Sequence, residues 1–158
     1  MRIVLATLLL IQIASCRGAE HAPIVERIEM NLSGWSAVEV EIDSRGEGRY
    51  RLSNPVPSGR SGTFSLSPQQ FAALVERLRP FQRQSVPLTE ESIAGILEFR
   101  CPEGLPQVID AGGFWIRWTG PEYDHHYVAD FGCDHERNRA RNDRLRGIME
   151  SLPVPLDR

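Results

Sequence analysis

The sequence predicts an α+β domain, in which an antiparallel sheet carries two helices packed on one face. Two observations support this class. Runs that alternate apolar and polar residues, typical of half-buried strands, dominate the chain, and two segments repeat apolar residues at helical spacing. The predicted order is strands, helix, strands, helix, and no long alternation of strands with helices favours a parallel sheet.

A hairpin is predicted in the first third of the chain, after an earlier strand at 28–32. The segments "AVEVEID" (37–43) and "GRYRL" (48–52) each alternate apolar and charged residues, and the turn "SRGEG" separates them. An antiparallel register that pairs Val40 with Tyr50 also sets each glutamate of the first strand opposite an arginine of the second. Because both patterns agree on one register, we expect a hairpin here.

The first helix is predicted to follow a short strand at 63–67. Ser67 is the expected N-cap, Pro68 is the first helical residue, and Gln70 completes a capping box. The apolar residues recur at the spacing of one helical face: Phe71, Leu74, Val75 and Leu78. Pro80 is expected to end the helix, because proline interrupts the helical hydrogen bonding.

More strands are predicted between the two helices. The segment "GILEFRC" (95–101) alternates apolar and charged residues, and "VIDAGG" is a candidate for a short strand. The segments "FWIRWT" (114–119) and "HYVADF" (126–131) flank a turn and predict a second hairpin. Pairing Thr119 with His126 gathers the apolar residues of both strands on one continuous face.

The last helix is predicted to follow Asp134, which is its expected cap. A second apolar stripe marks its buried face: Leu145, Ile148, Met149 and Leu152. Pro153 is expected to stop the helix. This stripe and that of the first helix would pack on the apolar side of the sheet.

Two of the three cysteines lie in the predicted domain. Cys101 and Cys133 each fall on the apolar face of a predicted strand, so both thiols should point toward the core. An exported compartment permits such a pair to form a disulfide. We predict the bond Cys101–Cys133, which would stabilise the fold by about 3–4 kcal/mol on the chain-entropy model. Two buried free thiols, or a redox or metal role, are the alternatives, although the spacing is unlike CxxC.

Potential metal ligands crowd into "DHHYVADFGCDHE" (124–136). On a strand, His126 and Asp130 would share the polar face but lie about 13 Å apart, and Cys133 would point the other way. A zinc ion needs its ligands within about 2–2.3 Å. We therefore predict no metal site and no cofactor, with His125 and His126 exposed on the hairpin. A site that combines one histidine with a remote ligand is the alternative.

Catalytic residues form no recognisable constellation in the sequence. Carboxylates occur on several predicted strands, but nothing in the sequence shows two of them converging. No GxSxG motif is present. All 18 basic residues are arginine, which excludes a Schiff-base or P-loop lysine. We predict that the protein is not an enzyme; a small envelope hydrolase using carboxylates near His126 and Asp130 is the alternative.

Two surfaces are candidates for binding. Trp115 and Arg117 share the polar face of their strand and suit contact with a partner or glycan, unless another element covers the tryptophan. Arg137, Arg141 and Arg144 share one helical face and suit anionic lipid headgroups or a cell-wall polymer; the alternative is a solvated helix face. The net charge of −3 argues against nucleic acid as a partner.

The N-terminal segment "MRIVLATLLLIQIASC" has the organisation of a secretory signal peptide, with Arg2, an apolar run and small residues before Cys16. The apolar run is too short to span a bilayer. The ending "IASC" resembles a bacterial lipobox, which implies cleavage before Cys16 and diacylglycerol attachment to its sulfur. Arg17 stands where an inner-membrane retention signal would place Asp, which favours the outer membrane, facing the periplasm. An ordinary secretory signal cut nearby, or an uncleaved anchor, is the alternative.

These observations divide the chain into a signal peptide (1–15), a lipidated cysteine with a tether (16–24) and one domain (25–158). Residues 35–81 are similar in layout to small uncharacterised domains of bacterial lipoproteins, which implies a fold and no activity; the extra cysteines of that family are absent here. We expect a membrane-anchored binding or structural module of the cell envelope. Its partners would be the membrane and an envelope protein or cell-wall polymer, and inhibition of an envelope hydrolase is a further alternative.

Overall fold

The computed structural model describes residues 24–34, 37–53, 59–97 and 100–156. The predicted signal peptide and lipidation site, with Cys16, lie outside these residues. Ten elements follow along the chain: β1 (Arg27–Ser33), β2 (Ala37–Asp43), β3 (Glu47–Ser53), β4 (Arg60–Ser65), α1 (Pro68–Gln82), β5 (Val86–Pro87), α2 (Glu90–Leu97), β6 (Gly113–Gly120), β7 (Tyr123–Asp130) and α3 (His135–Glu150).

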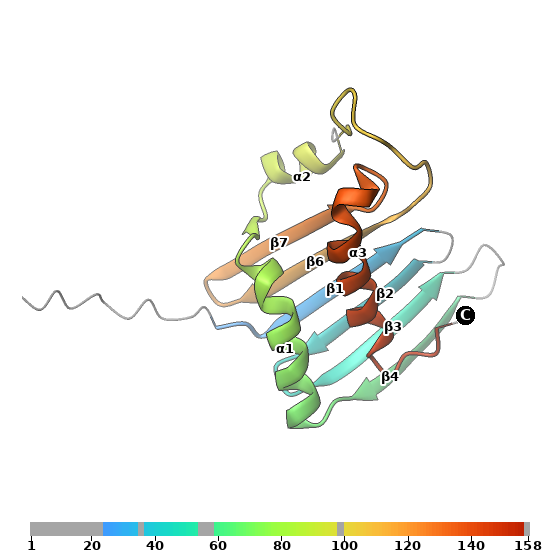
Figure 1. Cartoon of the computed structure of the whole chain (residues 1–158). Helices are drawn as coiled ribbons and strands as arrows, with labels where there is room; N and C mark the ends of the chain where they lie inside the picture. The colour runs from blue at the N-terminus through green and yellow to red at the C-terminus, as the bar shows by residue number, and fades with distance from the viewer. Residues whose placement is uncertain (1–23, 35–36, 54–58, 98–99, 157–158) are drawn as a thin grey trace, which may run out of the picture.

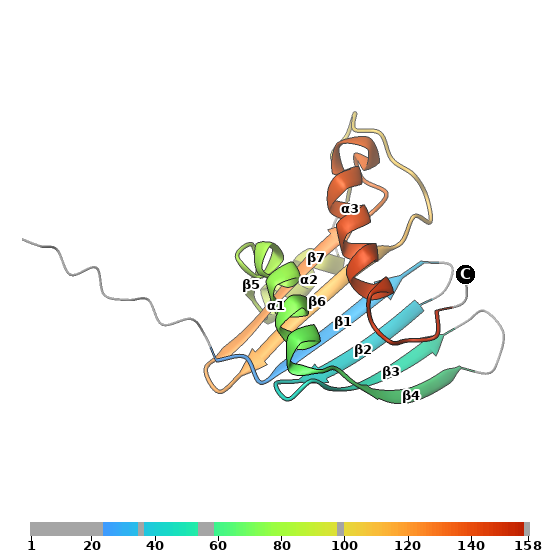
Figure 2. The ribbon, with the colours of Figure 1, turned by 60° about the horizontal axis from the view of Figure 1, so that its bottom comes forward.

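The strands form one seven-stranded antiparallel sheet in the order β4-β3-β2-β1-β6-β7-β5. Both α1 and α3 lie over the same face of this sheet (Figures 1 and 2). The short helix α2 lies near the edge of the sheet that β7 and β5 form (Figure 1). The prediction of an α+β fold with an antiparallel sheet is confirmed, although the described residues form three helices, one more than expected.

The core fills the space between the sheet and the two helices α1 and α3. Its largest fully buried apolar side chains come from both layers: Trp118, Phe114, Ile28, Met30, Ile42, Ile116, Leu78, Leu145, Ile148 and Met149. Burying one side chain of this size stabilises a fold by about 1.5–3 kcal/mol. No helix of the described residues combines the length and hydropathy needed to span a bilayer.

The first predicted hairpin is confirmed. Val40 of β2 pairs with Tyr50 of β3, in the predicted register. The carboxylate of Asp43 closes the turn, because its Oδ1 accepts the backbone N–H groups of Arg45 at 2.9 Å and Glu47 at 3.0 Å. The side chain of the last residue of β2 therefore satisfies donors that the turn would leave unpaired.

The predicted start of α1 is confirmed, but its predicted end is wrong. Ser67 Oγ accepts the backbone N–H of Gln70 at 3.3 Å, and Gln70 Oε1 accepts that of Ser67 at 2.8 Å. The helix continues through Pro80 to Gln82. Pro80 lies in the last turn, where the helix loses one backbone hydrogen bond and keeps the rest.

The predicted register of the second hairpin is also corrected. The prediction paired Thr119 with His126, whereas Thr119 pairs with Asp124. Arg117 is then the partner of His126. The strands continue to pair as far as Gly120, because the connection between them is a tight turn. A shift of two residues keeps every side chain on its predicted face, so the predicted apolar face is confirmed.

The segment 95–101 does not form the predicted strand, because most of it belongs to or follows α2. The helix begins where Thr89 and Ser92 cap each other: Ser92 N–H donates to Thr89 Oγ1 at 3.1 Å, and Thr89 N–H donates to Ser92 Oγ at 2.9 Å. The segment 108–113 is a loop as far as the start of β6. Its neighbour Gln107 forms an isolated bridge with Cys133.

The predicted disulfide Cys101–Cys133 is present, with Cα atoms 5.3 Å apart. Cys101 lies in the loop after α2 and not on a strand, which corrects the placement on which the prediction rested. Two backbone hydrogen bonds support the bridge: Val108 N–H donates to the carbonyl of Gly132, and Asp134 N–H to that of Pro106. The loop before β6 is thereby fastened to the start of α3.

The predicted capping role of Asp134 is corrected by the structure. Asp134 precedes α3 with a left-handed backbone (φ 45°), and its side chain makes no capping hydrogen bond. The predicted apolar stripe of the helix is confirmed, since Leu145, Ile148 and Met149 are fully buried.

Candidate functional site

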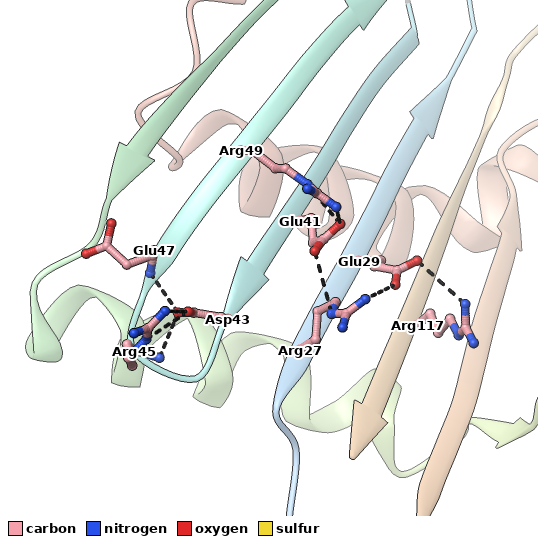
Figure 3. A network of polar contacts seen from close by, with 8 residues as sticks. All are labelled: Arg27, Glu29, Glu41, Asp43, Arg45, Glu47, Arg49 and Arg117. Carbon is pink, nitrogen blue, oxygen red and sulfur yellow. Dashed lines mark hydrogen bonds and ion pairs between the residues drawn. The ribbon is translucent and has the colours of Figure 1, made fainter. Parts of the chain in front are cut away.

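The sheet face opposite α1 and α3 carries a ladder of alternating charges, and we call it the charged face (Figure 3). Glu41 accepts a hydrogen bond from Arg49 Nε at 3.0 Å and lies 3.6 Å from Arg27 Nε. Glu29 continues the ladder, 3.8 Å from both Arg27 and Arg117. Partly exposed ion pairs of this kind contribute about 0.2–1 kcal/mol each. The ladder therefore compensates its own charges and adds little stability.

Arg117 is the least exposed arginine of this ladder. Its Nε and Nη2 donate to the two carboxylate oxygens of Asp124 at 2.7 Å and 2.8 Å. The hydrogen bond from Arg117 lowers the pKa of Asp124, and the same bond raises the pKa of Arg117. The structure thus places this predicted binding residue where its charge is already compensated.

A groove with a volume of about 1030 Å³ lies at the β7 end of the sheet. We call it the edge groove and define it by six lining residues: Val86, Ile93, Ile96, Trp115, Val128 and Arg141. Its apolar walls are accessible, because Val86, Ile93 and Val128 are 49%, 43% and 39% exposed. A second hollow of about 610 Å³ over the charged face also has Trp115 in its lining, so the two adjoin.

His126 lies in the wall of the edge groove with one nitrogen unpartnered. The residue is 2% exposed, which corrects the prediction of an exposed histidine. Trp115 Nε1–H donates to its Nδ1 at 3.3 Å. Since Nδ1 accepts, the neutral ring carries its proton on Nε2. That Nε2 is buried and has no hydrogen-bond partner among the described residues.

Burial also determines the charge of this histidine. Desolvation lowers the pKa of His126, and the nearby Asp124 opposes this shift only in part. The ring is therefore neutral at neutral pH and adds no positive charge to the wall of the groove.

Nearby carboxylates are engaged elsewhere. Asp130 Oδ1 accepts the backbone N–H groups of Gly132 at 2.6 Å and Cys133 at 3.0 Å. Asp124 is held by Arg117. His125 lies on the opposite face, where it stacks on Tyr123 with ring centroids 4.2 Å apart. No group of three or more His, Cys, Asp or Glu side chains among the described residues is arranged to hold a metal ion.

The edge groove unites only some of the predicted binding residues. Trp115, half-buried, and Arg141, from α3, line it together. Arg117 belongs to the charge ladder. Arg137 and Arg144 are exposed on α3 and do not line the groove.

Sequence reasoning missed β5 and most of α2, which build the groove walls. The segment "SVPLTEES" (85–92) predicts a loop, with a helical turn after Thr89 as the alternative, yet its Val86 and Pro87 form β5 and pair with His126 and His125. A two-residue strand is too short for an alternating pattern to reveal it. The reciprocal cap at Thr89 was the available signal for the second wall, α2.

No family model and no curated protein matches the sequence. Among solved structures, an SsgA-like sporulation-specific cell division protein from Thermobifida fusca is similar at 8% identity, over 84% of this chain and 83% of that one. The TM-score is 0.20, a value too low to support an inference about fold or function.

Proposed function

We propose that the protein is a lipid-anchored module of the cell envelope that binds a partner and does not catalyse a reaction. The signal-peptide pattern and the ending "IASC" support export and attachment at Cys16. Two or more acyl chains hold a protein stably on a membrane. The anchor would keep the domain at the membrane surface, facing the periplasm from the outer membrane. The disulfide Cys101–Cys133 fits an oxidising compartment.

The observation that carries the binding role is the edge groove, whose accessible apolar walls adjoin the guanidinium of Arg141. The apolar walls supply contact area, and Arg141 supplies a charged donor. Pockets that combine apolar walls with a few polar groups are typical of binding sites. The carboxylates nearest to His126 are held by Arg117 or by backbone N–H groups, so no acid–base pair converges on the groove among the described residues.

An envelope protein or cell-wall polymer would be the partner in this proposal. Trp115 provides a large amphipathic surface beside the groove, a residue type often found at the centre of interfaces. The exposed Arg137 and Arg144 are available for a wider contact with an acidic partner.

Two experiments test this function. The substitution Cys16→Ser should release the protein from membranes and abolish labelling with palmitate; unchanged fractionation without label would contradict the lipid anchor. A photo-crosslinking residue at Val128 should capture a partner in intact cells, and Trp115→Ala should weaken that capture. The same crosslinker at Glu76, exposed on α1, is the matched control. Equal capture at both positions, or none at Val128, would contradict binding at the groove.

A further inference from the structure

Strand β7 has an edge that is only partly covered. Among the described residues, β5 is the one strand paired along this edge, and it covers only His125 and His126. The carbonyl of Asp124 points to the β5 side, where it accepts Leu88 N–H at 2.8 Å. Backbone groups of alternate residues point to the same side of an antiparallel strand, so the N–H and C=O of Val128 point to this edge. Neither has a partner among the described residues.

The edge groove runs along this uncovered part of β7. Proteins usually protect a strand edge with charged residues, proline or a covering element. Here the cover that β5 provides begins only at Val86, opposite His126, and Val128 and Ile93 expose apolar surface beyond it. Gly95 of α2 lines the groove, and a Cβ added there would meet no atom within 4 Å, so a larger residue can be introduced without a clash.

A cation lies at the α3 end of the groove. Arg141 Nη2 donates to the carbonyl of Asp130 at 2.6 Å, and its Nε donates to Asn142 Oδ1 at 2.9 Å. No carboxylate of the described residues forms an ion pair with this guanidinium. The remaining N–H groups of Arg141 can bind a carboxylate, because a guanidinium carries five donors.

We propose that the edge groove binds an extended peptide segment of the partner protein, which adds to β7 as a strand and places a carboxylate against Arg141. This inference rests on the proposed binding function and specifies its partner. The segment would accept from Val128 N–H and donate to Val128 C=O, as in β-strand addition. Its alternate side chains would contact the apolar wall of α2. An amphipathic lipid offers a carboxylate and an apolar chain but no donor for the Val128 carbonyl, so the peptide fits better.

The test uses the folded domain with its disulfide and a displayed library of random eight-residue peptides. The enriched peptides should have an apolar residue at every second position and an acidic group near one end. Gly95→Trp should block the groove and reduce their affinity by more than about tenfold. Ala94→Trp is the matched control, since Ala94 is exposed on the same helix and does not line the groove. The control should leave the affinity unchanged.

Two further comparisons test the chemistry. Arg141→Gln should lower the affinity for an enriched peptide by about tenfold, the loss typical of one charge-assisted hydrogen bond. It should not lower the affinity for the same peptide when its carboxylates are converted to amides. Amidation of the C-terminus alone distinguishes a terminal carboxylate from an acidic side chain. N-methylation of the peptide nitrogen that faces the Val128 carbonyl should abolish binding, because strand addition needs that donor.

Several outcomes would overturn the inference. If no enriched peptide distinguishes Gly95→Trp from Ala94→Trp, or if N-methylation has no effect, strand addition at β7 is wrong. If palmitate binds in the groove and is lost in Gly95→Trp while no peptide binds, the ligand is a lipid. The proposed function is tested separately. Crosslinking from Val128 that persists in cells carrying Gly95→Trp would retain the binding role and remove only the peptide inference.

Discussion

Removal of the disulfide should destabilise the domain by an amount that the chain length between its cysteines determines. The bond joins Cys101 to Cys133, with a sequence separation of 32. The chain-entropy relation gives a loss of about 12 cal/mol/K for a loop of this length, or about 3.7 kcal/mol at 25 °C. The double substitution Cys101→Ala, Cys133→Ala should therefore lower the free energy of unfolding by about that amount.

Urea denaturation and thermal unfolding measure this change. The unfolding entropy is about 2.1 cal/mol/K per residue, so a domain of this size should lose roughly 13 °C in Tm. The slope of the free energy against urea should increase, because a denatured chain without the cross-link exposes more surface. The loop before β6 would also lose its covalent attachment to α3.

Reduced wild-type protein is the matched control for the alanine substitutions. Its stability should lie close to that of the double variant, which separates loss of the bond from loss of the sulfur atoms. Cys133 is buried, so a small packing difference between the two is expected. If the double variant is as stable as oxidised wild-type protein, or if wild-type protein denatured without reductant shows two free thiols, the reasoning is refuted.

Three further perturbations have expected outcomes. Burial lowers the pKa of His126 below its usual 6.5, so the unfolded state takes up the proton at a higher pH than the folded state. The free energy of unfolding should therefore fall as pH drops below about 6.5. His126→Gln should flatten this decrease and His125→Gln should not; if urea denaturation at several pH values gives both variants the same dependence of unfolding free energy on pH, the assignment to His126 is refuted. Ser67→Ala should cost about 1 kcal/mol by removing the N-cap of α1, measured by urea denaturation. Gly112 has φ +75°, and a Cβ there would lie 2.1 Å from a carbonyl oxygen of β1, so Gly112→Ala should destabilise by at least about 1–3 kcal/mol. Gly95→Ala is its control and should stabilise the domain by about 0.5–1 kcal/mol. A Gly112→Ala variant as stable as the wild-type protein would contradict the argument from backbone strain.

Predictions from sequence succeeded where short-range pattern and turn chemistry agree. The hairpin that pairs Val40 with Tyr50 is one example, because apolar and charged residues both select its register. The capping box of Ser67 and Gln70 is another, because its hydrogen bonds join residues three apart. The prediction of the disulfide was right although Cys101 lies on no strand, so its success owes more to the presence of two cysteines in the predicted domain than to the strand argument.

Predictions failed where a short segment depends on distant contacts. The run at 95–101 alternates like a strand, yet a cap at Thr89 starts a helix that takes most of it. The register of the second hairpin was wrong by two residues, since every even shift keeps the same faces and pattern alone does not choose between them. The burial of His126 could not be predicted, because it depends on this register and on β5.

The first hairpin, the apolar faces of α1 and α3 and the cap of α1 follow from the sequence alone, because neighbouring residues determine them. The site follows only from the tertiary structure. Trp115, Val86, Ile93 and Arg141 come from four elements that adjoin because β6, β7 and β5 are neighbours in the sheet and α2 and α3 flank its edge. A groove depends on the relative positions of side chains far apart in the chain, and no local pattern encodes those positions. Within the stretch 124–136, the structure places one buried histidine, His126, beside an uncovered strand edge.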